Sequence, residues 1–278
     1  MARSLDGSEL VGFIKERQAK QVRALRQAHV IFPRLVILMT PKSGEVIGVY
    51  VKGKRAYAED ILIDTVVEIC EQDQMQESIR RWNADDSVQG IIVQLPLDDP
   101  SETEAIVNAI APEKDVDGLG HEAVYPSATA DAINWLCGGY NVPLDTAKIA
   151  IIGRGRLVGA PLTFMWSASG YDVTTVDIDT KNRAEILKES DVVVSAAGAP
   201  RSVNASDIKQ GAFVIDAGTT SENGTVVGDI ADDVRERSDV SITPKKGGVG
   251  PLTIALLFDH LVQACLAQAN AMQSQESA

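Results

Sequence analysis

Tyr50 and Lys54 stand four positions apart in the stretch "YVKGK", and their side-chain types could support proton transfer. The stretch is typical of the first turns of a helix, and side chains at this spacing project from one helix face. A lysine beside a phenol can act as a proton-transfer group whose pKa is set by its surroundings. The alternative is a solvated surface residue, since most lysines are exposed. The pentapeptide alone favours that simpler interpretation.

More polar residues follow predicted strands. "GIIVQLPL" places Gln94 beside Pro96, where the chain leaves a strand, and "EKDVDG" supplies Asp115 and Asp117. Each has a simpler explanation, such as a turn amide, a bend or a solvated acid. A glycine loop, "GGVGPLT", runs into a predicted helix and contributes Gly247, Gly248 and Pro251, with the proline near the first turn.

The stretch "IIGRGRLVG" has the pattern of a dinucleotide-binding turn. Gly153, Gly155 and Gly159 form G-x-G-x-x-x-G between a predicted strand and a predicted helix, one residue longer than the common fingerprint. The glycines would provide a tight turn, a bare backbone against pyrophosphate and close helix packing. A glycine turn without a ligand is the alternative. The predicted cofactor-binding set also contains Arg154, Val158, Asp177, Gly198 and Gly218.

The acid at the end of the next strand bears on cofactor choice. Asp177 would accept hydrogen bonds from the ribose hydroxyls of NAD and repel the additional phosphate of NADP. Asp179 adds to that repulsion. Arg154 argues in the other direction, because it could reach an adenosine phosphate. The balance favours NAD.

Composition narrows the function classes. The 278-residue chain has a net charge of −13, which disfavours nonspecific binding to nucleic acid or anionic membranes. No apolar run approaches the length of a membrane span, and the N-terminus lacks the apolar core of a signal peptide. The three scattered cysteines indicate a reducing cytoplasm without disulfides, and with three lone histidines a metal site is not expected. Lysine and arginine gather at 52–55 and at 245–246, either as local anion sites or as solvated faces.

Strand and helix patterns alternate along the chain, which predicts an α/β fold. In the first part, strands are predicted at 34–39, 65–70 and 90–95, and helices at 8–28, 51–62 and 75–83.

A second series begins near residue 148 and has five short apolar strands, with helices at 159–169 and 183–189. Such alternation predicts a Rossmann-like, doubly wound parallel sheet. We therefore expect two domains: a substrate domain over 1–122 and a dinucleotide-binding domain over 123–251. A last helix over 252–270 would pack back on the substrate domain. The boundary falls in the Gly-, Pro-, Ser- and Ala-rich stretch 118–130.

Together, and in this order, the motifs resemble those of the bifunctional methylenetetrahydrofolate dehydrogenase/methenyltetrahydrofolate cyclohydrolase family. The resemblance runs over nearly the whole chain, from "DG" at 6–7 to the last helix. The motifs that carry it are "YVxxK", "VQLPL", "KDVDG", "GRxxxVGxP", "VVGD" and "TPxxGGVGPxT".

The resemblance implies two reactions. One oxidises 5,10-methylenetetrahydrofolate to the 5,10-methenyl form with NAD(P), and the other hydrolyses that form to 10-formyltetrahydrofolate. Lys54 resembles the family's catalytic lysine, oriented by Gln94. Tyr50 would stack on or hydrogen-bond the folate, Asp117 would accept hydrogen bonds from the pterin, and the 247–251 loop would close over the substrate. A cytoplasmic homodimer is also implied.

Several positions depart from the family pattern, and they cluster around the predicted cleft. Ile47 stands where a serine is usual, Gly155 replaces the serine of "GRS", and Lys246 replaces a proline. "PSATAD" stands for "PCTPxG", and the segment 119–125 is about ten residues shorter than the resemblance leads us to expect. Two alternatives therefore stay open. One is a dehydrogenase that acts on another tetrahydropterin or lacks cyclohydrolase activity, and the other is a non-catalytic NAD-binding regulatory module.

Overall fold

The computed structural model describes residues 2–43, 45–222 and 225–276. Its contacts group the chain into two compact units. The three-stranded unit comprises Gly12–Ala128 and the chain from Ile254 onward, and the six-stranded unit comprises the residues up to Val11 together with Thr129–Thr253. The first residues thus group with the predicted dinucleotide-binding part and not with the substrate part, because they add a strand to its sheet.

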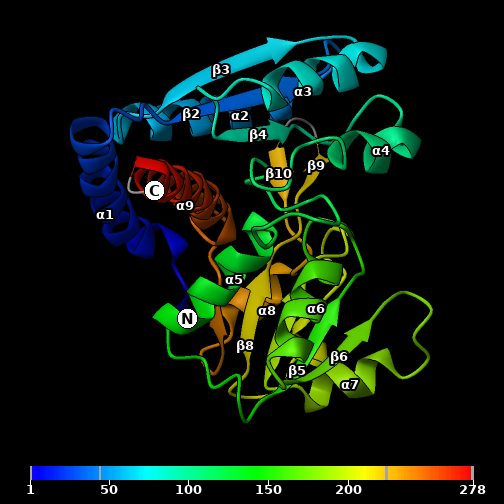
Figure 1. Cartoon of the computed structure of the whole chain (residues 1–278). Helices are drawn as coiled ribbons and strands as arrows, with labels where there is room; N and C mark the ends of the chain where they lie inside the picture. The colour runs from blue at the N-terminus through cyan, green and yellow to red at the C-terminus, as the bar shows by residue number, and fades with distance from the viewer. Residues whose placement is uncertain (1, 44, 223–224, 277–278) are drawn as a thin grey trace. The chain divides into compact units, whose positions relative to one another are not determined.

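The three-stranded unit is built on a parallel sheet (Figure 1). Its strands are β2 (Arg34–Met39), β3 (Asp64–Ile69) and β4 (Gly90–Val93), in the order β3-β2-β4. These match the three predicted strands, although β4 ends two residues early. The helices between them are α2 (Glu45–Asp60) and α3 (Met75–Asn83), followed by the short α4 (Thr103–Val107).

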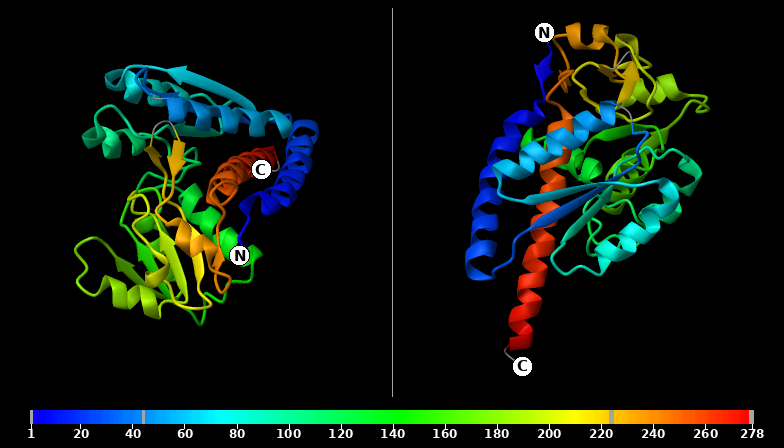
Figure 2. Two further views of the ribbon diagram at one scale, coloured as in Figure 1. Left: turned by 180° about the vertical axis from the view of Figure 1, so that it is seen from behind. Right: turned by 90° about the horizontal axis from the view of Figure 1, so that it is seen from above.

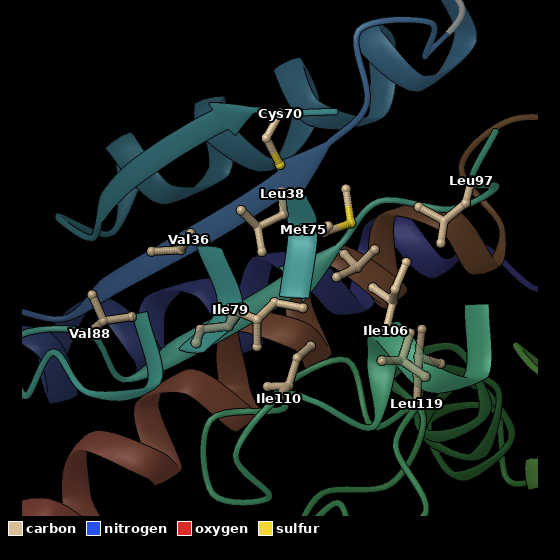
Figure 3. Close-up of a cluster of buried hydrophobic side chains, with 13 residues drawn as sticks. Val36, Leu38, Cys70, Met75, Ile79, Val88, Leu97, Ile106, Ile110 and Leu119 are labelled. Carbon is tan, nitrogen blue, oxygen red and sulfur yellow. The ribbon is translucent and has the colours of Figure 1, made fainter. Parts of the chain in front are cut away.

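The central strand β2 is covered on both faces, which explains its unbroken apolar run. Successive side chains of a strand point to opposite faces. Val36 and Leu38 point to one face, where Met75 and Ile79 of α3 pack against them (Figure 3). The whole buried cluster consists of Val36, Leu38, Cys70, Met75, Ile79, Val88, Ile91, Val93, Leu97, Ile106, Val107, Ile110 and Leu119.

Two long helices complete this unit. Helices α1 (Gly7–Ala28) and α9 (Val249–Glu276) lie side by side (Figure 2), and the Gln18 amide donates a 2.8 Å hydrogen bond to the Ala255 carbonyl. The ring of Phe258 on α9 is fully buried in the same unit. The prediction that the last helix packs on the first part of the chain is confirmed.

Helix α9 is unusually apolar. By length and composition alone, Val249–Ser274 could cross a membrane. This differs from the expectation that no apolar run approaches the length of a membrane span. More than half of that window is buried inside the protein, including Leu257, Leu261 and Val262. The apolar composition of α9 is therefore explained by its position in the core of the protein.

The six-stranded unit is a parallel sheet in the order β1-β11-β8-β7-β5-β6, which confirms the predicted doubly wound architecture. The short β1 pairs with β11 at the edge of the sheet. The strands are β1 (Arg3–Ser4), β5 (Lys148–Ile152), β6 (Asp172–Val176), β7 (Val192–Ser195), β8 (Phe213–Asp216) and β11 (Ser241–Ile242).

Helices connect most of these strands, and α6 and α7 lie close to the predicted ranges. An antiparallel pair, β9 (Thr220–Glu222) and β10 (Thr225–Val227), was not predicted. The helices of this unit are α5 (Ala128–Gly139), α6 (Gly159–Ala168), α7 (Arg183–Glu189) and α8 (Asp232–Glu236).

Candidate active site

Lys54 projects into the three-stranded unit and not into solvent. It lies on α2, is only 8% exposed, and its Nζ donates a 2.8 Å hydrogen bond to Gln94 Oε1. Gln94 directly follows β4, where its backbone N–H donates to the Leu38 carbonyl at 2.8 Å. The solvated-surface interpretation of Lys54 is therefore wrong. A strand end holds the amide that orients this amine.

The charges of Lys54 and Asp117 are both disfavoured where they lie. Burial lowers the pKa of the Lys54 amine, and the nearby Asp117 carboxylate opposes that shift. Burial also raises the pKa of the Asp117 carboxyl, whereas Lys54 and His260 lower it. Because neither charge is strongly stabilised, the amine can become neutral at a lower pH than an exposed lysine would.

The two acids of "EKDVDG" have different roles. The Asp115 carboxylate is buried and accepts hydrogen bonds from the backbone N–H groups of Gly118, Leu119 and Gly120, at 3.0, 3.1 and 2.7 Å. Burial raises the pKa of this carboxyl, and the N–H groups oppose the shift. Asp115 therefore shapes the loop. Asp117 is half-buried, and its carboxyl lies close enough to Lys54 and His260 for both to lower its pKa.

Lys114 anchors the loop from the other side. Its Nζ donates hydrogen bonds to the carbonyl oxygens of Trp82, Asn83 and Asp85, at 3.2, 2.8 and 2.8 Å, where α3 ends. A cation is favourable at a helix C-terminus because the last carbonyls lack helical partners.

We expect Lys114→Met to lower the free energy of unfolding by about 1–2 kcal/mol, since the three carbonyls lose a charged donor. Urea denaturation with an unchanged m-value measures this. Lys20→Met is the matched control, because the Lys20 amine lies in an exposed i,i+4 pair with Glu16. An equal, small effect of both substitutions would contradict the anchoring role.

The other predicted substrate residues of this unit flank Lys54 and Gln94. Tyr50 is half-buried one turn before Lys54 on α2, and burial raises the pKa of its phenol. Ile47, at the position where the resemblance has serine, is buried on the same helix. Pro96 follows Gln94 across a cis Leu95–Pro96 peptide.

The predicted glycine loop belongs to the six-stranded unit. Gly247 has φ +90°, a conformation that favours glycine, and its carbonyl accepts a 3.0 Å hydrogen bond from the Ser8 N–H. A Cβ at Gly7 would lie 2.0 Å from the Gly248 oxygen. The "DG" near the N-terminus therefore packs directly under the loop. Pro251 lies in the first turn of α9, as expected.

The glycines of the predicted dinucleotide turn occupy distinct environments. Gly153 has φ +100°, and a Cβ there would lie 2.5 Å from the Ala196 oxygen. A Cβ at Gly159, the first residue of α6, would lie 2.2 Å from the Gly153 oxygen. Gly155 has open space around the Cβ position, and Val158 is buried just before the helix. The tight turn and the close helix packing are thus present, with an open backbone between them.

Arg154 and Asp177, which argued in opposite directions for cofactor choice, form an ion pair. Arg154 Nε donates to Asp177 Oδ2 at 3.0 Å, and Thr180 Oγ1 donates to Asp177 Oδ1 at 2.8 Å. The Thr180 hydroxyl and the Arg154 guanidinium lower the pKa of the Asp177 carboxyl. Asp177 is therefore ionised, and it neutralises the cation nearest to it.

The two remaining predicted cofactor residues lie around a buried acid that sequence reasoning did not single out. Asp229 is fully buried, and Gly218 passes so close that a Cβ would lie 2.3 Å from its Oδ1. Gly198 has φ +62° in the loop that this carboxylate holds. The only sequence signal was its place at the end of "VVGD". Its hydrogen-bond donors are Ser195 Oγ at 2.9 Å, Ala197 N at 2.8 Å and Ala199 N at 2.8 Å.

Comparison with known proteins shows two matches to family models that together span most of the chain. Residues 5–117 match the tetrahydrofolate dehydrogenase/cyclohydrolase catalytic domain, and residues 127–269 match the NAD(P)-binding domain of the same family. The bifunctional protein FolD of Staphylococcus carnosus is 34% identical over 279 residues, covering 95% of this chain and 97% of that protein.

Solved structures agree with these matches. The bifunctional enzyme FolD from Campylobacter jejuni superposes with a TM-score of 0.89 at 30% identity, covering 96% of this chain and 100% of that one. The dehydrogenase-cyclohydrolase of Trypanosoma brucei, solved with NADP cofactor and an inhibitor, has a TM-score of 0.88 at 29% identity, covering 96% and 98%.

Proposed function

The chain belongs to the tetrahydrofolate dehydrogenase/cyclohydrolase family, and we propose that its catalytic residues are Lys54, Tyr50, Gln94 and Asp117. It is a bifunctional enzyme of one-carbon folate metabolism. It oxidises 5,10-methylenetetrahydrofolate to the methenyl form and hydrolyses that form to 10-formyltetrahydrofolate. The observation that carries the residue assignment is a buried amine, 2.8 Å from the Gln94 amide oxygen, near the Asp117 carboxylate.

Lys54 suits the hydrolytic step. Water adds to the one-carbon carbon of the methenyl cation, and a neutral Lys54 amine takes the proton that the water loses. The ammonium so formed returns a proton to the ring nitrogen as its bond to that carbon breaks. The remaining hydroxyl proton passes to the regenerated amine and on to solvent, so the hydroxyl becomes the formyl carbonyl and the ring is open. Gln94 fixes the amine through its hydrogen bond. The lowered pKa of Lys54 supports this role, because only the neutral amine is a base.

The folate would be recognised by the residues around this amine. The Asp117 carboxylate can accept hydrogen bonds from the pterin amino group and ring nitrogen. Tyr50, half-buried one turn before Lys54, offers a ring face and a hydroxyl whose pKa burial raises. Pro96 follows Gln94, and the loop with Gly247, Gly248 and Pro251 is assigned to closing over the substrate.

The cofactor turn fits a nicotinamide dinucleotide. Gly155 leaves its backbone open beside the N-terminus of α6, where N–H groups can bind pyrophosphate. When bound there, a nicotinamide would supply the acceptor for the hydride of the one-carbon bridge. The chain contributes alignment to that step, and no protein nucleophile is required. Arg154, Val158, Gly198 and Gly218 are assigned to the same binding region.

We assign NAD as the preferred cofactor. The Asp177 carboxylate is ionised and already pairs with Arg154, the cation that would otherwise attract the additional phosphate of NADP. A ribose with free hydroxyls can donate hydrogen bonds to this carboxylate, whereas a phosphate is repelled by it.

Asp177→Ser is expected to reverse the preference. It removes the repelling charge and frees Arg154, so kcat/KM with NADP should rise about tenfold and kcat/KM with NAD should fall about tenfold, each about 1.4 kcal/mol. Steady-state kinetics with both dinucleotides measure this. Asp179→Ser is the control, because its carboxylate forms no described ion pair, and it should shift the preference much less. A wild-type enzyme that already prefers NADP would refute the assignment.

A spectrophotometric assay with methylenetetrahydrofolate and each dinucleotide, followed by methenyl hydrolysis, tests the whole proposal. Turnover in the first step alone would favour a monofunctional dehydrogenase, and dinucleotide binding without turnover would favour a regulatory module. The Lys54–Gln94 hydrogen bond supports the bifunctional enzyme. Three reduced, buried cysteines support a cytoplasmic location. The homodimer stays a prediction from the family resemblance.

A further inference from the structure

His260 of α9 is a buried histidine to which the proposed reaction assigns no role. It is 5% exposed, and its Nδ1 lies 2.9 Å from the Val116 carbonyl oxygen. A carbonyl oxygen only accepts hydrogen bonds, so Nδ1 carries the hydrogen and donates it. The contact joins residues 144 positions apart in the sequence. It therefore ties the peptide immediately before Asp117 to a long core helix.

The imidazole of His260 also packs against an aromatic ring. The Tyr125 ring stacks on the imidazole with centroids 5.3 Å apart and an interplanar angle of 15°. Tyr125 ends the segment 119–125, which is shorter than the family resemblance leads us to expect. The Val124 N–H, next to it, donates to the Pro112 carbonyl at 3.2 Å. The short segment is thus held at its far end by the same histidine.

Asp117 lies between these attachments. The Val116 carbonyl before it accepts the hydrogen bond from His260, and its own carbonyl accepts a 3.0 Å hydrogen bond from the Ala128 N–H. The Asp115 carboxylate holds the N–H groups that follow. Burial raises the pKa of the Asp117 carboxyl, and a charge on His260 is close enough to lower it. The histidine is therefore coupled to Asp117 both through the backbone and through space.

We propose that His260 and Tyr125 are a positioning pair that sets the direction of the Asp117 carboxylate towards the pterin. The inference rests on the proposed function of Asp117 in binding folate. Neither residue needs to touch the substrate. A displacement of about 1 Å in a group that orients a substrate can reduce catalysis about 10²-fold. Loosening the attachment that holds Asp117 in place should therefore have a measurable effect on the kinetics.

The first test separates the hydrogen bond from the ring. His260→Phe keeps a ring for Tyr125 but removes the donor to Val116, and we expect the folate KM to rise about tenfold in both reactions. The KM for NAD should stay within about twofold, because the cofactor residues lie in the six-stranded unit. His260→Asn restores an N–H near the Nδ1 position and should recover most of the folate KM. His121→Phe, the same change in an exposed histidine whose ring pairs with Glu104, serves as the control.

The second test uses the partly exposed partner of the stack. Tyr125→Phe keeps the stacking ring and should leave the folate KM near the wild-type value, whereas Tyr125→Leu should raise it severalfold. In the double variant His260→Phe/Tyr125→Leu the combined effect should be smaller than the product of the single effects, because both act on one attachment. Urea midpoints of all variants identify any that lose the fold, and KM is compared only among folded enzymes.

The outcomes separate the role of the His260–Tyr125 pair from the role of Asp117 in binding folate. If Asp117→Asn raises the folate KM while folded His260→Phe and Tyr125→Leu leave it unchanged, the positioning pair is refuted and the role of Asp117 stands. If Asp117→Asn itself leaves the folate KM unchanged, the proposed folate contact is refuted first. Equal KM increases for folate and NAD in His260→Phe would indicate a general structural effect and would also overturn the inference.

Discussion

Lys54→Met is expected to lower the turnover of methenyl hydrolysis by about 10²–10⁴-fold, the usual contribution of a positioned general base. The methionine chain fills much of the same buried volume but can neither take nor return a proton. Binding of NAD should be unaffected, because the cofactor residues belong to the other compact unit. Stopped assays of methenyl consumption, with dinucleotide affinity measured separately, provide the two readouts.

Two substitutions sharpen this test. Lys54→Arg keeps a cation but stays protonated, so it should be as inactive in hydrolysis as Lys54→Met. Lys52→Met, on the exposed face of the same helix, should behave as wild type. Hydrolysis by Lys54→Met within threefold of wild type would remove Lys54 from the mechanism.

The pH dependence of methenyl hydrolysis should reflect the protonation of Lys54. The folded-state pKa of Lys54 lies below its usual value, chiefly because of burial. The neutral amine therefore persists to lower pH than in an exposed lysine, and hydrolysis should decline only as the pH falls through that lowered pKa. In Lys54→Met this acidic limb should disappear together with most of the rate.

Asp117→Asn is expected to reduce kcat/KM for folate about 10²-fold in both reactions. A carboxylate can accept hydrogen bonds from the amino group and the ring N–H of a pterin together, whereas an amide presents a donor to one of them. An unmatched donor in a buried site costs about 1–3 kcal/mol. Kinetics of the two reactions measure the loss, and Asp64→Asn, at the exposed start of β3, is the control. A reduction confined to one reaction would contradict a shared folate contact.

The same substitution should move the pH profile. The Asp117 carboxylate raises the pKa of Lys54 against the larger effect of burial. Its removal therefore lowers that pKa further, and the residual hydrolysis of Asp117→Asn should extend to lower pH than in wild type. A shift in the other direction would show that the two groups are not coupled as described.

Strongly periodic elements could be predicted from the sequence. The run 34–39 coincides with β2 because both of its faces are buried and every residue is apolar except the first. Helix α3 coincides with 75–83, since Met75 and Ile79 repeat at helical spacing towards the core. Elements of two or three residues, such as β1 and β9, have too few residues for a periodicity to appear.

The arrangement of the active-site residues could be predicted only in part from the sequence. The motif around Lys54 indicated the chemistry of this lysine. Its burial depends on how α2 packs in the folded unit, and a five-residue stretch carries no information on that packing. The pairing of Arg154 with Asp177 depends on the direction of a long, flexible side chain. Likewise, "KDVDG" contains two acids, and only the hydrogen bonds of Asp115 identify it as the structural one. His260 stood within an apolar helix pattern, where a histidine carries no local signal.

The dependence of the three-stranded unit on α9 has a consequence for synthesis of the protein. Residues 12–128 leave the ribosome long before residue 254, yet Leu261 of α9 lies so close to β4 that a Cβ on Gly90 would be 2.6 Å from it. Phe258 likewise stacks on Tyr57 at 5.3 Å. A nascent chain therefore carries an unfinished apolar surface while the six-stranded unit is being translated. A premature stop codon ahead of residue 254 leaves that surface uncovered, so we expect even a late truncation to destabilise the part of the enzyme that is made first.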